Sequence, residues 1–388
     1  MTREAKHELF KVLDKIGSKL DITKAQYETA KKRYKAVGKW LAEGEYCLVS
    51  KKICLNDGEI YPQGSMRLAT AVKPIKGEEF DVDLVFFSPN ISQYDIEPTE
   101  LNRLIGNRLR AEGSPYKDKI EPLKRGWRVI YANEFHLDIT PSINNHTEEN
   151  NSELVPDRKL QDWKPSNPKD YADWFDKCSE KIPQLSYVSR DNIIMASESH
   201  EVVDFPENDE VKPLLKRYVQ ILKRHRDEMF KDKDHKPISI IITTLATHAY
   251  NKCVSSNTYD NELDLLIDII KIMPDFIEGY EGHYKISNPT TKFENFAERW
   301  NEVPAKKKTF DLWYSNALAF FEALYTLSGQ HRIFKILKEG FGEEPVSIVY
   351  DDINVNVEKN RKKGLLGLSI GSTATASSPM KKNTFYGK

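Results

Sequence analysis

The first part of the chain carries apolar side chains at three- and four-residue intervals, which places them on one face of a helix. These positions are Leu9, Val12, Leu13, Ile16, Leu20, Ile22, Tyr27, Ala30, Tyr34 and Val37. The pattern predicts that residues 1–45 are helical.

From Ile60 onward the helical spacing gives way to turn residues and short apolar runs. The sequence YPQGS at 61–65 is typical of a turn, and alternating apolar residues predict strands at 80–87, 127–131 and 134–139. A helix is predicted at 99–112, and the polar stretch 146–168 is interpreted as a crossing loop or linker. Strands mixed with a helix favour an α+β, mixed-sheet domain, which we place at residues 46–205.

Helical spacing returns in the second half of the chain. It predicts helices at 211–229, 239–251, 262–273, 293–300 and 312–327, and therefore a helical domain at residues 206–360. The last segment, 361–388, is rich in Gly, Ser, Thr and Ala and has little to bury, so we expect a flexible tail.

Composition narrows the functional classes. The chain has 388 residues, with 58 basic against 59 acidic side chains, so it lacks the basic excess typical of proteins that hold long nucleic acids. The four cysteines form no CxxC pair, which favours reduced thiols in the cytosol. The N-terminus lacks the apolar core of a signal peptide, and the apolar run 238–246 is too short to span a bilayer. We expect a cytoplasmic protein that acts on small substrates.

The strongest chemical signal is the pair Asp81 and Asp83 in the predicted strand FDVDLVFF. Residues two apart on a strand point to the same face, so the two carboxylates lie side by side. Such a pair repels and is costly to bury, and a divalent cation removes that conflict. Oxygen ligands favour Mg²⁺ or Mn²⁺.

A third carboxylate and a Gly-Ser turn complete the pattern. Asp138 interrupts the apolar strand FHLDITP, and three carboxylates on adjacent strands can hold the two metals used in phosphoryl transfer. Asp81 and Asp83 would contact both metals, and Asp138 would bind the metal beside the attacking hydroxyl. Upstream, Gln63, Gly64 and Ser65 have the residue types that cradle phosphate oxygens.

With these motifs the chain resembles the DNA polymerase β-like nucleotidyltransferases. It is most similar to the bacterial cGAS/DncV-like branch, the cyclic-oligonucleotide synthases of antiphage systems. The similar stretches are 61–74, 79–87, 135–143, 163–175, 215–227, 238–250 and 288–300. One departure is visible, because this chain has Ala69-Thr70 where relatives often have Gly-Thr.

The resemblance implies a bilobed fold braced by a long N-terminal helix. It also implies Mg²⁺- or Mn²⁺-dependent joining of nucleoside triphosphates, ATP or GTP, into a cyclic di- or trinucleotide with release of pyrophosphate. Gly64 and Ser65 would hold the triphosphate, and Asp81, Asp83 and Asp138 would bind metal. Base preference, ring size and linkage stay open.

Two weaker features carry alternatives. Lys216 and Lys223 share a face of the predicted helix 211–229, either as a solvated basic face or as nucleotide-binding cations, as the resemblance favours. Among the aromatics, Trp163, Tyr171 and Trp174 are candidates for base stacking or for the core.

The C-terminal tail is a further feature with an alternative. Some synthases of this type have a flexible C-terminus whose last carboxylate a ubiquitin-transfer-like enzyme attaches to other molecules. The ending FYGK resembles such a tail, although the terminal Lys388 departs from the usual small residue, and an inert tail is the alternative.

Two other functions compete with cyclic-nucleotide synthesis. A template-independent enzyme that extends RNA 3′ ends would use the same three aspartates, but the near-neutral charge argues against it. A non-catalytic nucleotide sensor on the same fold is disfavoured because Asp81, Asp83 and Asp138 are all present.

Overall fold

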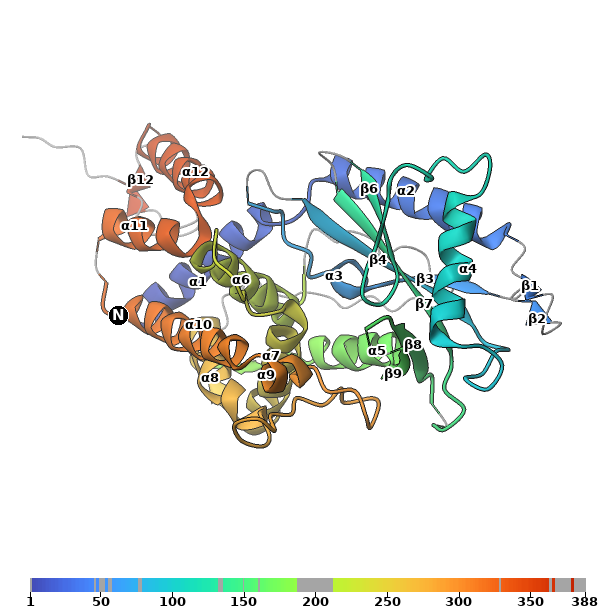
Figure 1. Cartoon of the computed structure of the whole chain (residues 1–388). Helices are drawn as coiled ribbons and strands as arrows, with labels where there is room; N and C mark the ends of the chain where they lie inside the picture. Colours follow the sequence, from blue (N-terminus) through green and yellow to red (C-terminus); the bar gives the residue numbers. More distant parts are fainter. Residues whose placement is uncertain are drawn as a thin grey trace, which may run out of the picture.

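The computed structural model describes residues 2–44, 58–75, 79–131, 135–148, 150–159, 161–186, 212–327 and 329–362, together with the short strand pieces 47–48, 53–54, 365–366 and 378–379. The chain forms two halves that lie side by side (Figure 1). We call them the sheet half, which contains a seven-stranded sheet with α2, α3 and α4, and the helical half, which contains α1 and α5–α12. This arrangement confirms the predicted α+β fold with a C-terminal helical region.

The central sheet runs in the order β3-β4-β7-β6-β5, with β8 beside β7 and β9 beside β8. Its strands are β3 Glu59–Gln63, β4 Phe80–Ser88, β5 Ile120–Pro122, β6 Trp127–Tyr131, β7 Phe135–Asn144, β8 Glu153–Asp157 and β9 Asp162–Ser166. β4 and β7 are parallel neighbours, and the other pairs are antiparallel. The strands predicted at 80–87, 127–131 and 134–139 correspond to β4, β6 and β7.

The interpretation of 146–168 as a loop or linker is wrong, because β8 and β9 lie within it. Its polar residues are held inside the fold by specific partners. The Tyr61 hydroxyl donates a hydrogen bond to the buried Glu153, and Lys124 forms a 2.8 Å ion pair with the buried Asp157. The polar composition of this stretch therefore led to a loop prediction where the buried strand β8 lies.

One face of the sheet is covered by α2 Lys24–Ala42 and α4 Pro98–Arg110. Val82, Leu84 and Leu137 point into this apolar layer and are fully buried. The residues that alternate with them point to the opposite face, which carries the three aspartates. The sheet therefore separates an apolar side from a polar one.

The helical half is built around one large hydrophobic core. Its elements are α5 Pro168–Ser179, α6 Leu214–Met229, α7 Ser239–Ser256, α8 Glu262–Ile272, the 3₁₀ helix η1 Met273–Phe276, α9 Glu298–Glu302, α10 Pro304–Ala323, α11 Gln330–Phe341 and α12 Glu343–Lys362. The helices predicted at 211–229, 239–251 and 262–273 match α6, α7 and α8. The one predicted at 312–327 overlaps α10, which begins earlier.

The helix predicted at 293–300 is wrong over most of its length. Phe293 is exposed, and helical structure begins only at Glu298. The side chains of Asn288 and Asn295 accept hydrogen bonds from the backbone N–H groups of Thr290 and Ala297, which favours a loop over a helix.

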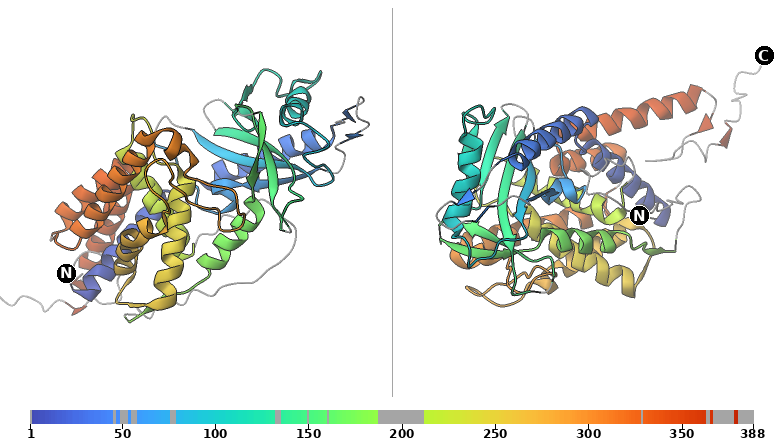
Figure 2. Two further views of the ribbon diagram at one scale, coloured as in Figure 1. Left: turned by 60° about the horizontal axis from the view of Figure 1, so that its bottom comes forward. Right: turned by 90° about the vertical axis from the view of Figure 1, so that its right-hand side faces the viewer.

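The N-terminal segment forms two helices rather than one. α1 Arg3–Lys19 ends before the connector 20–23, and α2 begins after Thr23, which forms a capping box with Gln26. α1 packs into the core of the helical half, and α2 packs into that of the sheet half (Figure 2). The segment thus contacts both halves.

Short paired strands complete the described structure. They are β1 Cys47–Leu48 with β2 Ile53–Cys54, β10 Gln184–Leu185 with β11 Thr258–Tyr259, and β12 Leu365–Leu366 with β13 Ser378–Pro379. The rest of the predicted tail, including Lys388, lies outside the described residues. Among the residues described, no helix has the length and apolarity to cross a bilayer.

Candidate active site

Two neighbouring strands bring the three predicted aspartates together. Asp81 and Asp83 alternate with buried apolar residues on β4, and Asp83 lies directly opposite Asp138 on the parallel strand β7. The side chain of Asp81 is 52% exposed and that of Asp138 is 16% exposed. The cluster is therefore reachable from solvent at Asp81 and enclosed at its inner end.

Arg128 lies across this cluster from the next strand, β6. Its Nε and Nη2 donate to the two carboxylate oxygens of Asp138 at 2.7 and 2.8 Å, and Nη2 also donates to Asp81 at 3.0 Å. From the sequence alone, Arg128 was a candidate either for a phosphate contact or for an ordinary surface position, and not for a partner of the aspartates. The available signal was its alternation with apolar Trp127 and Val129, which places it on the carboxylate face.

Burial and repulsion by neighbouring carboxylates raise the pKa values of Asp81 and Asp83. Burial, followed by the charges of Asp138 and Asp81, raises the pKa of Asp83 to about 7. Burial and the Asp138 charge likewise raise the pKa of Asp81, although Arg128 and His136 oppose that shift. A group of carboxylates with raised pKa values on one sheet face is a site where added positive charge is favourable.

The donor set fits a hard divalent cation, because oxygen ligands converge from two adjacent strands. Among the described residues, however, no group of three acidic, His or Cys side chains is already arranged to hold a metal ion. The bidentate contact of Arg128 explains this, since the guanidinium occupies the space between Asp81 and Asp138. Metal ligation by these aspartates would require the contact to loosen.

The Gly-Ser turn packs directly against the cluster. Gly64 has a φ of +65°, and a Cβ atom there would lie 2.3 Å from Oδ2 of Asp83, so a side chain does not fit. Gln63 donates to the Thr140 hydroxyl at 3.2 Å, which fixes the end of β3 to β7. Ser65 is partly exposed in the short helix α3 Gly64–Arg67. The turn and the carboxylates thus form one continuous surface.

The two predicted lysines have different surroundings. Lys223 is 5% exposed and donates to the carbonyl oxygen of Thr70 at 2.8 Å, so it is not part of a solvated face. Burial and the Arg226 charge lower the pKa of Lys223 to about 7, against the attraction of Asp227 and Asp83. Lys216 instead forms a 2.8 Å ion pair with Asp176 on α5.

The aromatic candidates divide in a similar way. Tyr171 is buried, and its hydroxyl hydrogen-bonds to that of Thr244 at 2.8 Å, so it belongs to the core. The Trp174 ring packs against Tyr171 and His248. Trp163 is partly buried against the core of the sheet half. Base stacking by Tyr171 is therefore excluded.

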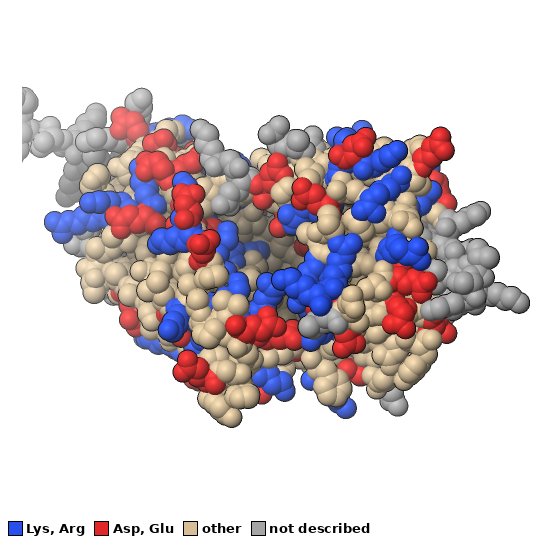
Figure 3. Space-filling view, viewed as in Figure 1, with Lys and Arg blue, Asp and Glu red and all other residues tan. Residues whose placement is uncertain are grey.

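A hollow opens between the two halves on the face shown in Figure 3, and Lys and Arg side chains lie on both of its sides. In the matching view of Figure 1, α3 and α6 border this region. The turn of Gly64 and the helix of Lys223 thus approach the same opening from opposite halves. A cationic rim around a carboxylate cluster suits a phosphate-bearing substrate.

Comparisons with known proteins agree with this geometry. The Second Messenger Oligonucleotide or Dinucleotide Synthetase (SMODS) domain model matches residues 9–179. The chain is 29% identical to the c-di-GMP synthase of Roseivirga ehrenbergii over 401 aligned positions, which cover 100% of this chain and 99% of the relative. It is 23% identical to the cyclic dinucleotide synthase CdnG of Bradyrhizobium diazoefficiens over 77% of this chain and 72% of the relative.

Solved structures show the same fold. CdnG of Bradyrhizobium diazoefficiens in complex with GTP superimposes with a TM-score of 0.64 at 20% identity, covering 88% of this chain and 97% of the other. DncV of Escherichia coli, in a 3′-deoxy GTP bound form, gives 0.54 at 17% identity over 89% of each chain. Fold, carboxylate cluster and matched domain together define an enzyme of the nucleotidyltransferase class. Within that class, the chain carries a SMODS domain and is similar to the cGAS/DncV-like nucleotidyltransferases.

Proposed function

We propose that this enzyme joins two molecules of GTP into a cyclic dinucleotide and releases two molecules of pyrophosphate. A relative of nearly the same length bears the name c-di-GMP synthase, and the structure of CdnG contains GTP. These names support a guanine substrate and a two-nucleotide ring. The observation that carries the proposal is the register of Asp83 with Asp138 beside Asp81 and the Gly64 turn.

The geometry suits an in-line displacement at phosphorus. A ribose hydroxyl of one nucleotide attacks the α-phosphorus of the other, and the bond to the bridging oxygen breaks, so that pyrophosphate leaves. A second displacement between the same two nucleotides closes the ring. Mg²⁺ or Mn²⁺, when bound, supplies positive charge that stabilises the attacking and leaving oxygens. Asp81, Asp83 and Asp138 would hold the metal, and Asp138, beside the attacking hydroxyl, would lower the pKa of that hydroxyl or accept its proton.

The remaining residues bind the triphosphate. Gly64 and Ser65 offer backbone N–H groups and a hydroxyl beside Asp83, and Lys223 supports the same turn through Thr70. Because Lys216 is paired with Asp176, its contribution to nucleotide binding would require that ion pair to open. Arg128 orients Asp138.

The test is direct. Purified protein is incubated with each labelled ribonucleoside triphosphate, alone and in mixtures, with Mg²⁺, Mn²⁺ or EDTA. Phosphatase-resistant products are identified by mass spectrometry, and the Asp81→Ala, Asp83→Ala chain serves as the control. We expect a cyclic guanine dinucleotide only from the wild type with metal. Extension of an added RNA primer without cyclic products would instead establish the tailing activity.

The family resemblance also supports a proposal for the biological setting. We extend the proposal to a role in antiphage defence, with a ubiquitin-transfer-like enzyme acting on the tail. Phage challenge of cells carrying the gene with its neighbours, against the Asp81→Ala, Asp83→Ala version, tests the first part. Intact-mass analysis of the C-terminal peptide from the same cells tests the second, since conjugation adds mass at Lys388.

A further inference from the structure

A second cavity lies on the opposite face of the sheet from the aspartates. It has a volume of about 480 Å³, within the range of small-molecule pockets, and opens between α4, β6 and the end of β8. Its lining residues are Thr99, Asn102, Arg103, Arg110, Trp127 and Arg158. We call it the rear pocket. None of these residues takes part in the catalysis described above.

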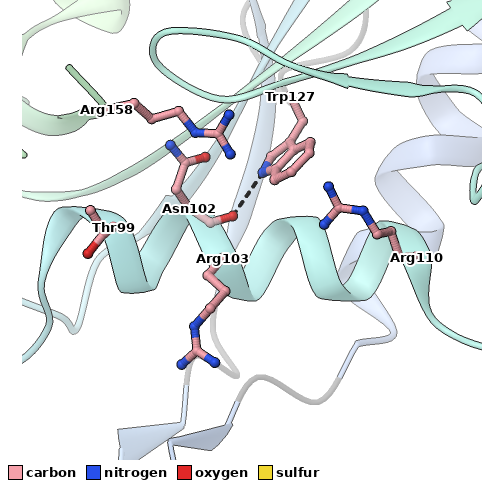
Figure 4. A pocket seen from close by; sticks show the side chains of 6 residues that line it. All are labelled: Thr99, Asn102, Arg103, Arg110, Trp127 and Arg158. Atoms are coloured by element: carbon pink, nitrogen blue, oxygen red, sulfur yellow. Dashed lines mark hydrogen bonds between the residues drawn. The ribbon is translucent and has the colours of Figure 1, made fainter.

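Two guanidinium groups flank a buried indole in the rear pocket. The guanidinium carbons of Arg110 and Arg158 lie 4.2 and 4.6 Å from the centre of the Trp127 ring, and Figure 4 shows the indole between them. Neither arginine forms an ion pair with any residue that the structure describes. A guanidinium over an aromatic ring keeps its in-plane N–H groups free to donate. The pocket therefore presents two forked donors, one on each side of the same ring.

An anion in the pocket would relieve the repulsion between these two cations, of which Arg110 is exposed and Arg158 partly buried. Burial and the charge of Arg110 lower the pKa of Arg158, as expected for two cations held close together. Arg103, at the edge of the pocket, forms an ion pair with Glu100 at 3.8 Å. Asp157, next to Arg158 in sequence, is already paired with Lys124. The rear pocket thus contains three arginines, and among the described residues only Arg103 has an acidic partner.

Asn102 adds a second and independent feature. The residue is 1% exposed, lines the pocket, and has no hydrogen-bond partner for either its amide nitrogen or its amide oxygen among the described residues. An unpaired buried amide is costly, and a ligand that supplies both an acceptor and a donor would remove that cost. A phosphate supplies acceptors alone, whereas a nucleobase edge or a ribose hydroxyl also supplies a donor.

The neighbouring helix α4 both binds the indole ring of Trp127 and leaves room for it. Its indole nitrogen donates to the carbonyl oxygen of Asn102 at 2.8 Å, and a Cβ atom at Gly106 would lie only 2.2 Å from the ring. α4 therefore approaches the ring at a residue without a side chain. Trp127 also precedes Arg128 on β6, so the two side chains point to opposite faces of the sheet. The rear pocket and the aspartate cluster thus share one strand.

We propose that the rear pocket is a second nucleotide-binding site, in which Arg110 and Arg158 hold phosphate and Asn102 hydrogen-bonds a base edge or ribose hydroxyl. Bidentate guanidinium contacts select phosphate, and the unpaired amide selects a nucleoside over a bare polyphosphate. The nucleotide can be the triphosphate substrate or the cyclic product, because both carry phosphate and base.

The site count per chain tests this proposal. Equilibrium dialysis of the full-length protein with a labelled non-hydrolysable GTP analogue, and separately with labelled cyclic di-GMP, should reveal a site that Asp83→Ala does not remove. Arg110→Ala with Arg158→Ala should weaken that site by about tenfold or more, because two charge-assisted contacts are lost. Arg332→Ala, which removes an exposed guanidinium from α11, is the matched control and should leave binding unchanged.

Two further measurements keep the result interpretable. Arg110→Lys with Arg158→Lys retains charge but loses the forked geometry, so we expect an intermediate loss of affinity, with circular dichroism confirming the fold. Equal affinity for pyrophosphate and the GTP analogue would overturn the nucleotide assignment. Absence of any site sensitive to the two arginines, with either ligand, would overturn the proposal entirely. Both results are independent of whether the enzyme makes a cyclic product.

Discussion

Arg128 controls the charge of the carboxylate cluster at the scale of a single residue. It bonds both oxygens of Asp138 and reaches Asp81, and its charge lowers the pKa of Asp81 and Asp83 against the effect of burial. Arg128→Gln therefore raises both pKa values further. Since metal and substrate need ionised carboxylates, we predict a fall in kcat of about tenfold or more at pH 7, with the acid limb of the pH–rate profile moved to higher pH.

Arg128→Lys is the matched control. It keeps the charge but loses the bidentate geometry, so the acid limb should stay near its wild-type position while kcat still falls. The profiles are measured as initial rates of pyrophosphate release between pH 5 and pH 9. Identical profiles for Arg128→Gln and wild type would show that Arg128 does not act on the aspartates.

Ala69 makes the second prediction at this scale. It has a φ of +54°, in the left-handed region, where a non-glycine residue costs about 1–2 kcal/mol. Ala69→Gly removes that cost but adds about 0.4–1 kcal/mol of unfolded-state entropy. We predict a net stabilisation of about 0.5–1 kcal/mol with unchanged kcat, measured by urea unfolding. A destabilised variant would mean that the Ala69 methyl group makes packing contacts worth more than the strain.

At the scale of elements, alternation of apolar and polar residues predicted the strands that carry the candidate site. Asp81, Asp83 and Asp138 each alternate with apolar residues that the structure buries. The local sequence was therefore enough to predict that these segments are strands and that the aspartates lie on the face opposite the apolar residues. β8 and β9 were missed because they contain Pro156, Pro165 and buried acids whose partners are distant in sequence. Likewise, the burial of Lys223 and the contacts of Arg128 depend on neighbouring elements, which no local pattern encodes.

The packing of α4 on β6 gives a prediction in which propensity and packing oppose each other. Alanine favours a helix over glycine by about 1 kcal/mol, yet a Cβ at Gly106 would lie 2.2 Å from the Trp127 ring. The indole is buried and flanked by two arginines, so it has little room to move. We predict that Gly106→Ala destabilises the protein by about 1–3 kcal/mol in urea unfolding.

A helix position without that contact provides the comparison. Gly38→Ala in α2 places its Cβ 3.5 Å from Ile60, an ordinary contact distance, and should be neutral or stabilising. If Gly106→Ala were as stable as Gly38→Ala, the indole would have to be displaced without cost. The rear pocket would then lack the rigidity on which its proposed function depends.

At the scale of the whole molecule, the connector between α1 and α2 joins the two halves. Asp21 accepts from Lys212 at 2.6 Å and from Gln220 at 2.7 Å, and it lies 3.4 Å from Arg217. Gln220 donates in turn to the carbonyl of Ala71, and the Lys73 N–H donates to that of Leu20. One carboxylate thus links the N-terminal segment, α6 and the chain that follows the Gly-Ser turn.

Removal of this carboxylate should weaken the whole junction. The side chains of Lys212 and Arg217 are 4% and 3% exposed, so Asp21→Ala leaves the buried Lys212 without its carboxylate and Arg217 with Asp14 alone. We predict a destabilisation of about 2–4 kcal/mol at pH 7, measured by urea unfolding. Asp14→Ala is the control, because Asp14 is itself 53% exposed and its removal leaves Arg217 paired with Asp21. That loss should be below about 1 kcal/mol.

The pH dependence separates a charge effect from lost packing. Burial already lowers the pKa of Lys212, and Asp21 opposes that shift, so Asp21→Ala lowers the pKa further. Between the folded pKa and the ordinary lysine value, the unfolded chain binds more protons than the folded one, and stability therefore rises with pH. The deficit of Asp21→Ala relative to wild type should consequently shrink between pH 7 and pH 9. A deficit independent of pH would place the effect in Arg217 and Gln220, whose charge states do not change over that range.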